Sequence, residues 1–150
     1  MPDAIVDTSV LIATEKLGIQ NLIAKVYDHI IAPRAVLDEY GKPEIEISVV
    51  ESPYIGIYRL LHEELNLGRG ESAAIALSQE TKTTILLDDL RARRIAKELG
   101  LRVSGTIGLL LRLEQILAPD FNAYSHAQRL RGIGFRIGDA LLETIRRKGV

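Results

Sequence analysis

Short, apolar-rich runs alternate along the chain with segments in which apolar residues recur every three or four positions. The runs lie at residues 4–6, 29–32, 83–87 and 101–104. Near-continuous apolar runs of this length are typical of buried strands in parallel sheets, and the intervening spacing is typical of helices that bury one face. Because the two kinds of segment alternate, the pattern predicts an α/β fold: a mostly parallel central sheet with helices on both faces.

Glycine and proline mark the ends of the predicted helices. Gly18 separates two short helices after the first strand, and Pro33 begins a helix at residues 34–40, in which Val36 and Tyr40 should face the sheet. Further helices are expected at residues 57–66, 71–80, 92–99, 107–117, about 122–131 and 138–147. The alternation of Ile45, Ile47 and Val49 is compatible with an additional edge strand.

The length of 150 residues predicts one domain over residues 1–150, with about 120–150 forming a C-terminal helical extension. The chain has no cysteine, which excludes disulfides and thiolate metal sites and fits a reducing compartment. No apolar run approaches the roughly 20 residues of a membrane span, so a cytoplasmic location without membrane contact is expected. The net charge of −1 means that any nucleic-acid contact must use a local basic patch.

Acidic residues occur where strands should end. Asp7 directly follows the first apolar run, and Asp88 and Asp89 follow the third. Glu39 lies three residues after Val36, on nearly the same helix side as an apolar position, and Glu71 falls in the first turn of a small-residue helix. Since parallel sheets place their chemistry beyond the carboxyl ends of the strands, we expect these side chains to converge at one edge.

Several carboxylates at one edge need a counterion. Two carboxylates about 4 Å apart repel by roughly 4 kcal/mol at an effective dielectric constant of about 20. Mg²⁺ and Mn²⁺ prefer oxygen ligands, neutralise this charge and assist attack of water on phosphodiesters. The acids therefore predict metal-dependent phosphodiester hydrolysis.

The order of these motifs resembles the PIN-domain family of metal-dependent nucleases over nearly the whole chain. The family opens with Asp-Thr-Ser after its first strand, as at Asp7-Thr8-Ser9. It has a glutamate on the helix after the second strand, as at Glu39, and an acid that begins a small-residue helix, as at Glu71. Its last acid follows the third long strand, often in a Thr-x-Asp context, where this chain has Leu87-Asp88-Asp89.

The resemblance implies a ribonuclease whose Mg²⁺ or Mn²⁺ is held by Asp7, Glu39, Glu71 and either Asp88 or Asp89, the catalytic residues, with Thr8 and Ser9 orienting an acid or a bound water. Together with the Leu67–Glu71 and Val103–Gly108 segments, it points to a prokaryotic subfamily similar to VapC toxins, and so to a small antitoxin partner and a homodimer. The arginines nearest the acids are candidate ligands for substrate phosphate: Arg69, Arg91, Arg93 and Arg94.

Simpler interpretations remain for each acid. Asp7, Asp88 or Asp89 could cap the following helix, Glu71 could favour a helix dipole, and Glu39 could be an ordinary half-exposed residue. The alternative function is a non-catalytic PIN-like module that binds nucleic acid or protein and keeps a vestigial acidic site. A zinc site is not expected because the three histidines lack ligand spacing, and the Gly-rich turn at residues 67–70 lacks the Gly-Lys-Ser/Thr ending of a phosphate-binding loop.

Overall fold

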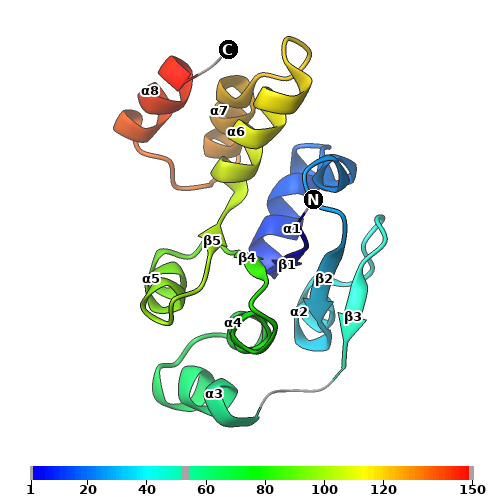
Figure 1. Ribbon diagram of the computed structural model, residues 1–150. Helices are drawn as coiled ribbons and strands as arrows, with labels where there is room; N and C mark the ends of the chain where they lie inside the picture. Colours follow the sequence, from blue (N-terminus) through cyan, green and yellow to red (C-terminus); the bar gives the residue numbers. More distant parts are fainter. Residues whose placement is uncertain (1, 52–54, 149–150) are drawn as a thin grey trace.

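The computed structural model describes residues 2–51 and 55–148, and its centre is a five-stranded sheet (Figure 1). The strands are β1 (Ala4–Val6), β2 (Ile30–Pro33), β3 (Ser48–Val50), β4 (Thr84–Leu86) and β5 (Val103–Ser104), in the order β3-β2-β1-β4-β5. All neighbouring pairs are parallel, and Ala4 lies opposite both Ile30 and Thr84. The predicted parallel α/β fold is confirmed.

The connections between strands are helical. They are α1 (Thr8–Lys16), the 3₁₀ helix η1 (Gln20–Lys25), α2 (Arg34–Tyr40), α3 (Ile55–Arg59), the π-helix η2 (Leu60–Glu64), α4 (Arg69–Thr81) and α5 (Leu90–Glu98). After β5 come α6 (Thr106–Leu117), α7 (Ala123–Gly132) and α8 (Asp139–Lys148). None of the helices formed by the described residues is long and apolar enough to cross a membrane.

Helices lie on both sides of the sheet, as right-handed crossovers require (Figure 1). Helix α4 packs across β2, β1 and β4, while α6 packs with α1 and η1, and α7 and α8 continue from α6. The buried strands between these layers carry fully buried side chains such as Ile5, Val6, Ile85 and Leu86. Helices α1, α2, α5 and α6 each follow a strand directly, so their N-termini meet at its carboxyl edge.

Some predicted boundaries differ from the structure. The edge strand is limited to Ser48–Val50, so Ile45 and Ile47 precede it, although both still pack against the core. The helix predicted at residues 57–66 is α3 followed by η2, and α4 begins at Arg69, two residues before its predicted start. Val36 is buried, and the partly buried Tyr40 packs against the core while its hydroxyl donates to Glu15 Oε1 at 2.5 Å.

Candidate acidic site at the carboxyl edge of the sheet

Asp7 lies between the end of β1 and the start of α1 and is buried, with 3% of its surface exposed. Its backbone occupies the N-cap position of α1, but its side chain makes no capping hydrogen bond. Within the described residues, Asp7 Oδ1 has no hydrogen-bond partner. Helix capping therefore does not explain this carboxylate, and a buried carboxylate oxygen without a partner is costly.

The environment of Asp7 favours its protonated form. The pKa of Asp7 is raised from 3.8 to about 7, mainly by burial and also by the negative charges of Glu71, Glu39 and Asp88, while the backbone N–H of Thr8 acts in the opposite direction. These three acids come from α4, α2 and the end of β4. The structure thus brings acids from four separate segments within electrostatic reach of one another.

Glu39 is fixed by two hydrogen bonds although solvent reaches it. Thr8 Oγ1 donates to Glu39 Oε2 at 3.0 Å, and the backbone N–H of Gly70 donates to Glu39 Oε1 at 2.9 Å. A Cβ atom at position 70 would lie 2.9 Å from Glu39 Oε2, so the approach depends on glycine. Glu39 is therefore not an unattached surface residue, and Thr8 is one of the two groups that hold its carboxylate.

Glu71 stands in the first turn of α4, where it also has a structural role. Its Oε1 accepts a hydrogen bond from the backbone N–H of Gly68 at 3.2 Å. Burial raises the pKa of Glu71, and Asp89 and Glu39 raise it further, whereas the Gly68 N–H and the charge of Arg91 lower it. Glu71 thus satisfies a backbone N–H at the start of α4 and also adds negative charge to the same edge of the sheet.

Asp88 and Asp89 differ in their partners. Asp89 caps α5, because its Oδ2 accepts from the backbone N–H of Ala92 at 2.9 Å. Asp88 instead reaches the start of α6, where Thr106 donates from its backbone N–H to Oδ1 at 2.7 Å and from its hydroxyl to Oδ2 at 2.6 Å. Of the two, Asp88 is the one whose charge acts on Asp7. This division favours Asp88 as the fourth site acid.

The roles of Thr106 and Gly70 were not identified from the sequence. Thr106 holds both oxygens of Asp88, and Gly70 holds Glu39 through its backbone N–H. The available signal was the Gly105-Thr106 pair that opens a helix directly after β5, at the carboxyl edge where the acids were expected. Gly105 leaves space there, since a Cβ atom would lie 2.7 Å from Asp88 Oδ1.

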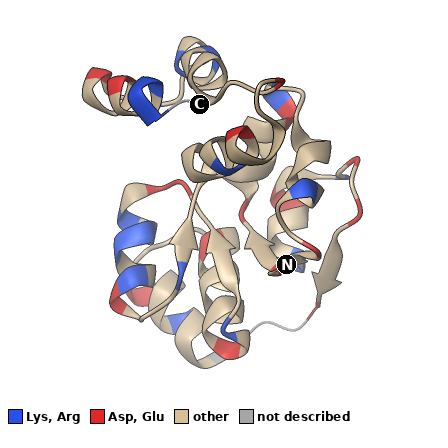
Figure 2. Cartoon of the chain, turned by 45° about the horizontal axis from the view of Figure 1, so that its top comes forward, with Lys and Arg blue, Asp and Glu red and all other residues tan. Residues whose placement is uncertain are grey.

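The four predicted phosphate ligands have different surroundings. Several Lys and Arg positions, coloured blue in Figure 2, follow one another along α5. Arg93 is partly occupied, because its Nη1 donates to the carbonyl of Leu87 at 2.8 Å. Arg91 acts electrostatically on Glu71, and with Arg94 it lines a groove between α5 and η2. Arg69 is exposed and lines a separate hollow beside Tyr58.

The acids do not form a closed metal cage. Among residues 2–51 and 55–148, no three His, Asp or Glu side chains are arranged so that they could hold an ion by themselves. Mg²⁺, however, usually keeps several waters and binds through one or two carboxylates plus substrate phosphate. The unpartnered Asp7 Oδ1 and an all-oxygen donor set suit that mode, and the buried, unpartnered Ser9 hydroxyl lies two residues away in the same helix turn.

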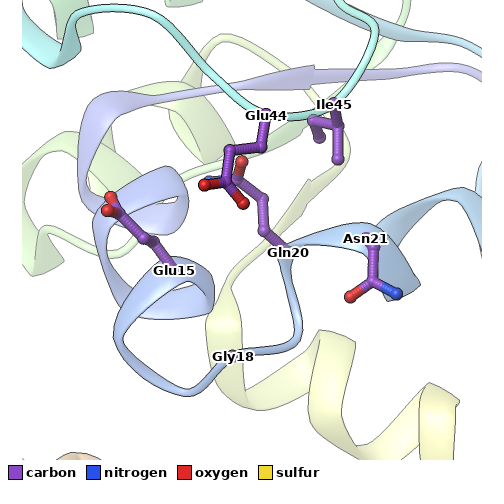
Figure 3. Close-up of a pocket in the computed structure, with 6 residues that line it drawn as sticks. All are labelled: Glu15, Gly18, Gln20, Asn21, Glu44 and Ile45. Carbon is purple, nitrogen blue, oxygen red and sulfur yellow. The ribbon is translucent and has the colours of Figure 1, made fainter.

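A pocket of about 200 Å³ lies elsewhere on the molecule (Figure 3). It is lined by Glu15, Gly18, Gln20, Asn21, Glu44 and Ile45. Glu15 belongs to the last turns of α1, whereas Asp7 precedes its first residue. This pocket is thus at the other end of the helix from the buried acid, and its residues were not predicted to be functional.

Comparison with known proteins agrees with this geometry. A family model described as DUF3368, PIN domain, matches residues 3–149. Comparisons with curated proteins and with solved structures gave no match. PIN domains are generally nucleases, which act on nucleic acids and usually use divalent metal ions. Because the match spans nearly the whole chain, and the parallel α/β fold is consistent with it, the chain belongs to the PIN-domain family.

Proposed function

We propose that the protein is a metal-dependent endoribonuclease that uses Asp7, Glu39, Glu71 and Asp88 to cleave RNA in the cytoplasm. The observation that carries this proposal is the buried carboxylate of Asp7, which has an unpartnered oxygen and lies within reach of three other acids. Folding positions this group at a cost, since a buried carboxylate oxygen without a hydrogen-bond partner destabilises the native state. A divalent cation is the natural compensation, because it favours the ionised form.

Each residue has a distinct task in this proposal. Asp7 offers a free oxygen ligand, and Asp88 offers a second carboxylate whose orientation Thr106 fixes. Glu39 and Glu71 hold water or further charge at the same edge, and Arg69 and Arg91 contact phosphates that flank the cleaved bond. When bound, a divalent cation supplies positive charge for the scissile phosphate and acidifies a water molecule.

The test is a cleavage assay with the purified protein and its Asp7→Asn variant. A panel of single-stranded and structured RNAs, with DNA of the same sequences, is incubated with Mn²⁺, with Mg²⁺ or with chelator. We expect cleavage of RNA that requires metal and is abolished by Asp7→Asn, because the amide cannot supply an anionic ligand. The variant should fold normally, since it removes one repelling charge.

Equal behaviour of the two proteins would contradict the nuclease. Identical cleavage by the two proteins would indicate a contaminating nuclease. No cleavage under any metal condition would favour a non-catalytic binding module. Cleavage of DNA alone would support phosphodiester hydrolysis but would contradict RNA as the substrate. A circular dichroism melt of both proteins shows whether a negative result reflects unfolding.

A second candidate is a non-catalytic PIN-like module. It is favoured by two observations: Glu39 and Asp88 are already occupied by internal hydrogen bonds, and the described residues form no ready-made metal cage. Titration with Mn²⁺ separates the two candidates. A working site should raise the melting temperature progressively as the Mn²⁺ concentration exceeds its Kd, whereas a vestigial site should bind weakly and stabilise little.

The resemblance to VapC toxins supports two further parts of the proposal, a small antitoxin partner and a homodimer. Light scattering of the purified protein tests the dimer directly, and a monomer at all concentrations would contradict it. Expression of the protein alone tests the toxin, because an active ribonuclease without its antitoxin should arrest growth and Asp7→Asn should relieve the arrest.

A further inference from the structure

A second concave feature lies beside Asp88 and is lined by residues of α5, β5, α6 and α8. It has a volume of about 330 Å³. Its walls are mainly apolar with a few polar groups, and include Asp88, Leu90, Val103, Ser104, Ile107 and Leu141. This combination is typical of small-ligand pockets, which range from about 300 to 1,000 Å³. Because Asp88 is one of the walls, the hollow adjoins the acidic edge at that residue.

Two leucines leave apolar surface exposed at this hollow. Leu90 begins α5 and is 78% exposed, and Leu141, in α8, is 45% exposed. Both are among the large hydrophobic residues of the described chain that solvent reaches most readily. Exposed apolar side chains that share a concave surface with a candidate active site indicate contact with a ligand more strongly than scattered ones do.

The polar atoms around the floor are held in place. Arg93 donates to the Leu87 carbonyl at 2.8 Å, and Thr106 fixes both oxygens of Asp88. Gly105 and Gly108 allow the first turn of α6 to lie against these groups, since a Cβ atom on Gly105 would lie 2.6 Å from Arg93 Nη1 and one on Gly108 would collide with Ser104 Oγ. The Ser104 hydroxyl itself makes no hydrogen bond to any described residue.

We propose that this hollow is a subsite for one unstacked nucleobase of the RNA strand, next to the phosphate at the acidic edge. The inference rests on the proposed function. Single-stranded RNA presents unpaired bases that proteins bind by their faces and by hydrogen bonds at their edges. The aliphatic side chains of Leu90, Ile107 and Leu141 supply contact for a base face, and the free Ser104 hydroxyl supplies an edge partner.

The position of the hollow favours a base over a segment of a partner protein. A base is joined to its phosphate through one ribose, so a base in this hollow leaves its phosphate within the same small region as Asp88. A subsite here would give the nuclease a sequence preference that phosphate contacts from arginines cannot supply. A segment of a partner protein, by contrast, carries no attached phosphate that would have to lie beside Asp88.

Binding of RNA by the Asp7→Asn protein tests the subsite without cleavage. Fluorescence anisotropy with Mg²⁺ would compare a labelled single-stranded RNA with versions that carry one abasic position each. We expect one abasic position to weaken binding about fivefold or more. Leu141→Ala and Ser104→Ala should weaken binding of the intact strand and leave the strand with that abasic position unchanged.

Ile116→Ala is the matched control, because Ile116 is an aliphatic residue of α6 that is 51% exposed and lies near the end of that helix away from Asp88. The subsite would be overturned if Leu141→Ala weakened binding of the intact and abasic strands equally, or no more than Ile116→Ala does. A protein segment would then be the better candidate occupant of the hollow. Absence of RNA binding would overturn it too. The cleavage assay judges the nuclease separately: base-dependent binding without cleavage by the unmodified protein would keep the subsite and refute catalysis.

Discussion

Thr106 is the residue on which the orientation of Asp88 depends, because it donates to both carboxylate oxygens. Thr106→Val removes the hydroxyl donor at nearly constant volume and leaves the backbone donor. A hydrogen bond to a charged group is worth about 1.5–3 kcal/mol, so we expect kcat to fall about tenfold or more with little change in KM. Weaker Mn²⁺ binding in calorimetry and rescue by Thr106→Ser would identify a positioning role. An equal loss in the serine variant would contradict it.

Gly70 makes a comparable prediction about packing. A methyl group at this position would press on the Glu39 carboxylate, whose oxygens would lie 2.9 and 3.0 Å from the new Cβ atom. We expect Gly70→Ala to lower the free energy of unfolding by about 1 kcal/mol, measured by urea denaturation, because the Glu39 carboxylate must shift and lose one of its two hydrogen bonds. Gly56→Ala in α3 is the control, because no atom of the described residues lies within 4 Å of its Cβ position and alanine favours the helix. A neutral result at position 70 would mean that Glu39 moves away freely.

The start of α5 gives the two neighbouring acids, Asp88 and Asp89, different roles. Asp89 caps this helix, and asparagine caps helices about as well as aspartate does. Asp89→Asn should therefore keep both the fold and most of the cleavage activity, whereas Asp89→Ala should cost about 1 kcal/mol of stability. Asp88→Asn should lose activity in the same assay. Loss of activity in Asp89→Asn with a normal melting temperature would instead make Asp89 the ligand.

Individual helices and strands were predicted best where burial determined the spacing of apolar residues along the sequence. The runs at β1, β2 and β4 and the helix at Arg34–Tyr40 were clear because apolar spacing and Pro33 leave few alternatives. The short edge strand β3 and the π-helical turn η2 were not, because they depend on backbone pairing and local geometry that carry little side-chain signal. The convergence of the acids followed from topology, while the hydrogen bonds that orient Glu39 and Asp88 required three-dimensional contacts.

For the molecule as a whole, the buried Asp7 links stability to pH and to metal. Its pKa of about 7 lies above the ordinary value of 3.8, so between pH 4 and pH 7 the folded protein retains a proton that the unfolded chain releases. The free energy of unfolding should therefore fall as pH rises through this range, by on the order of 4 kcal/mol from Asp7, and change no further from this group above it.

The Asp7→Asn variant isolates this contribution, because its amide does not titrate. In urea denaturation it should equal the unmodified protein near pH 4 and exceed it most at pH 8. Mn²⁺ should reverse the difference at pH 8, since it stabilises the ionised carboxylate, and should act less at pH 5.5, where protons compete for the ligand. Parallel pH profiles of the two proteins would show that Asp7 ionises as freely in the folded state as in the unfolded chain, and the need for a cation at this edge would then disappear.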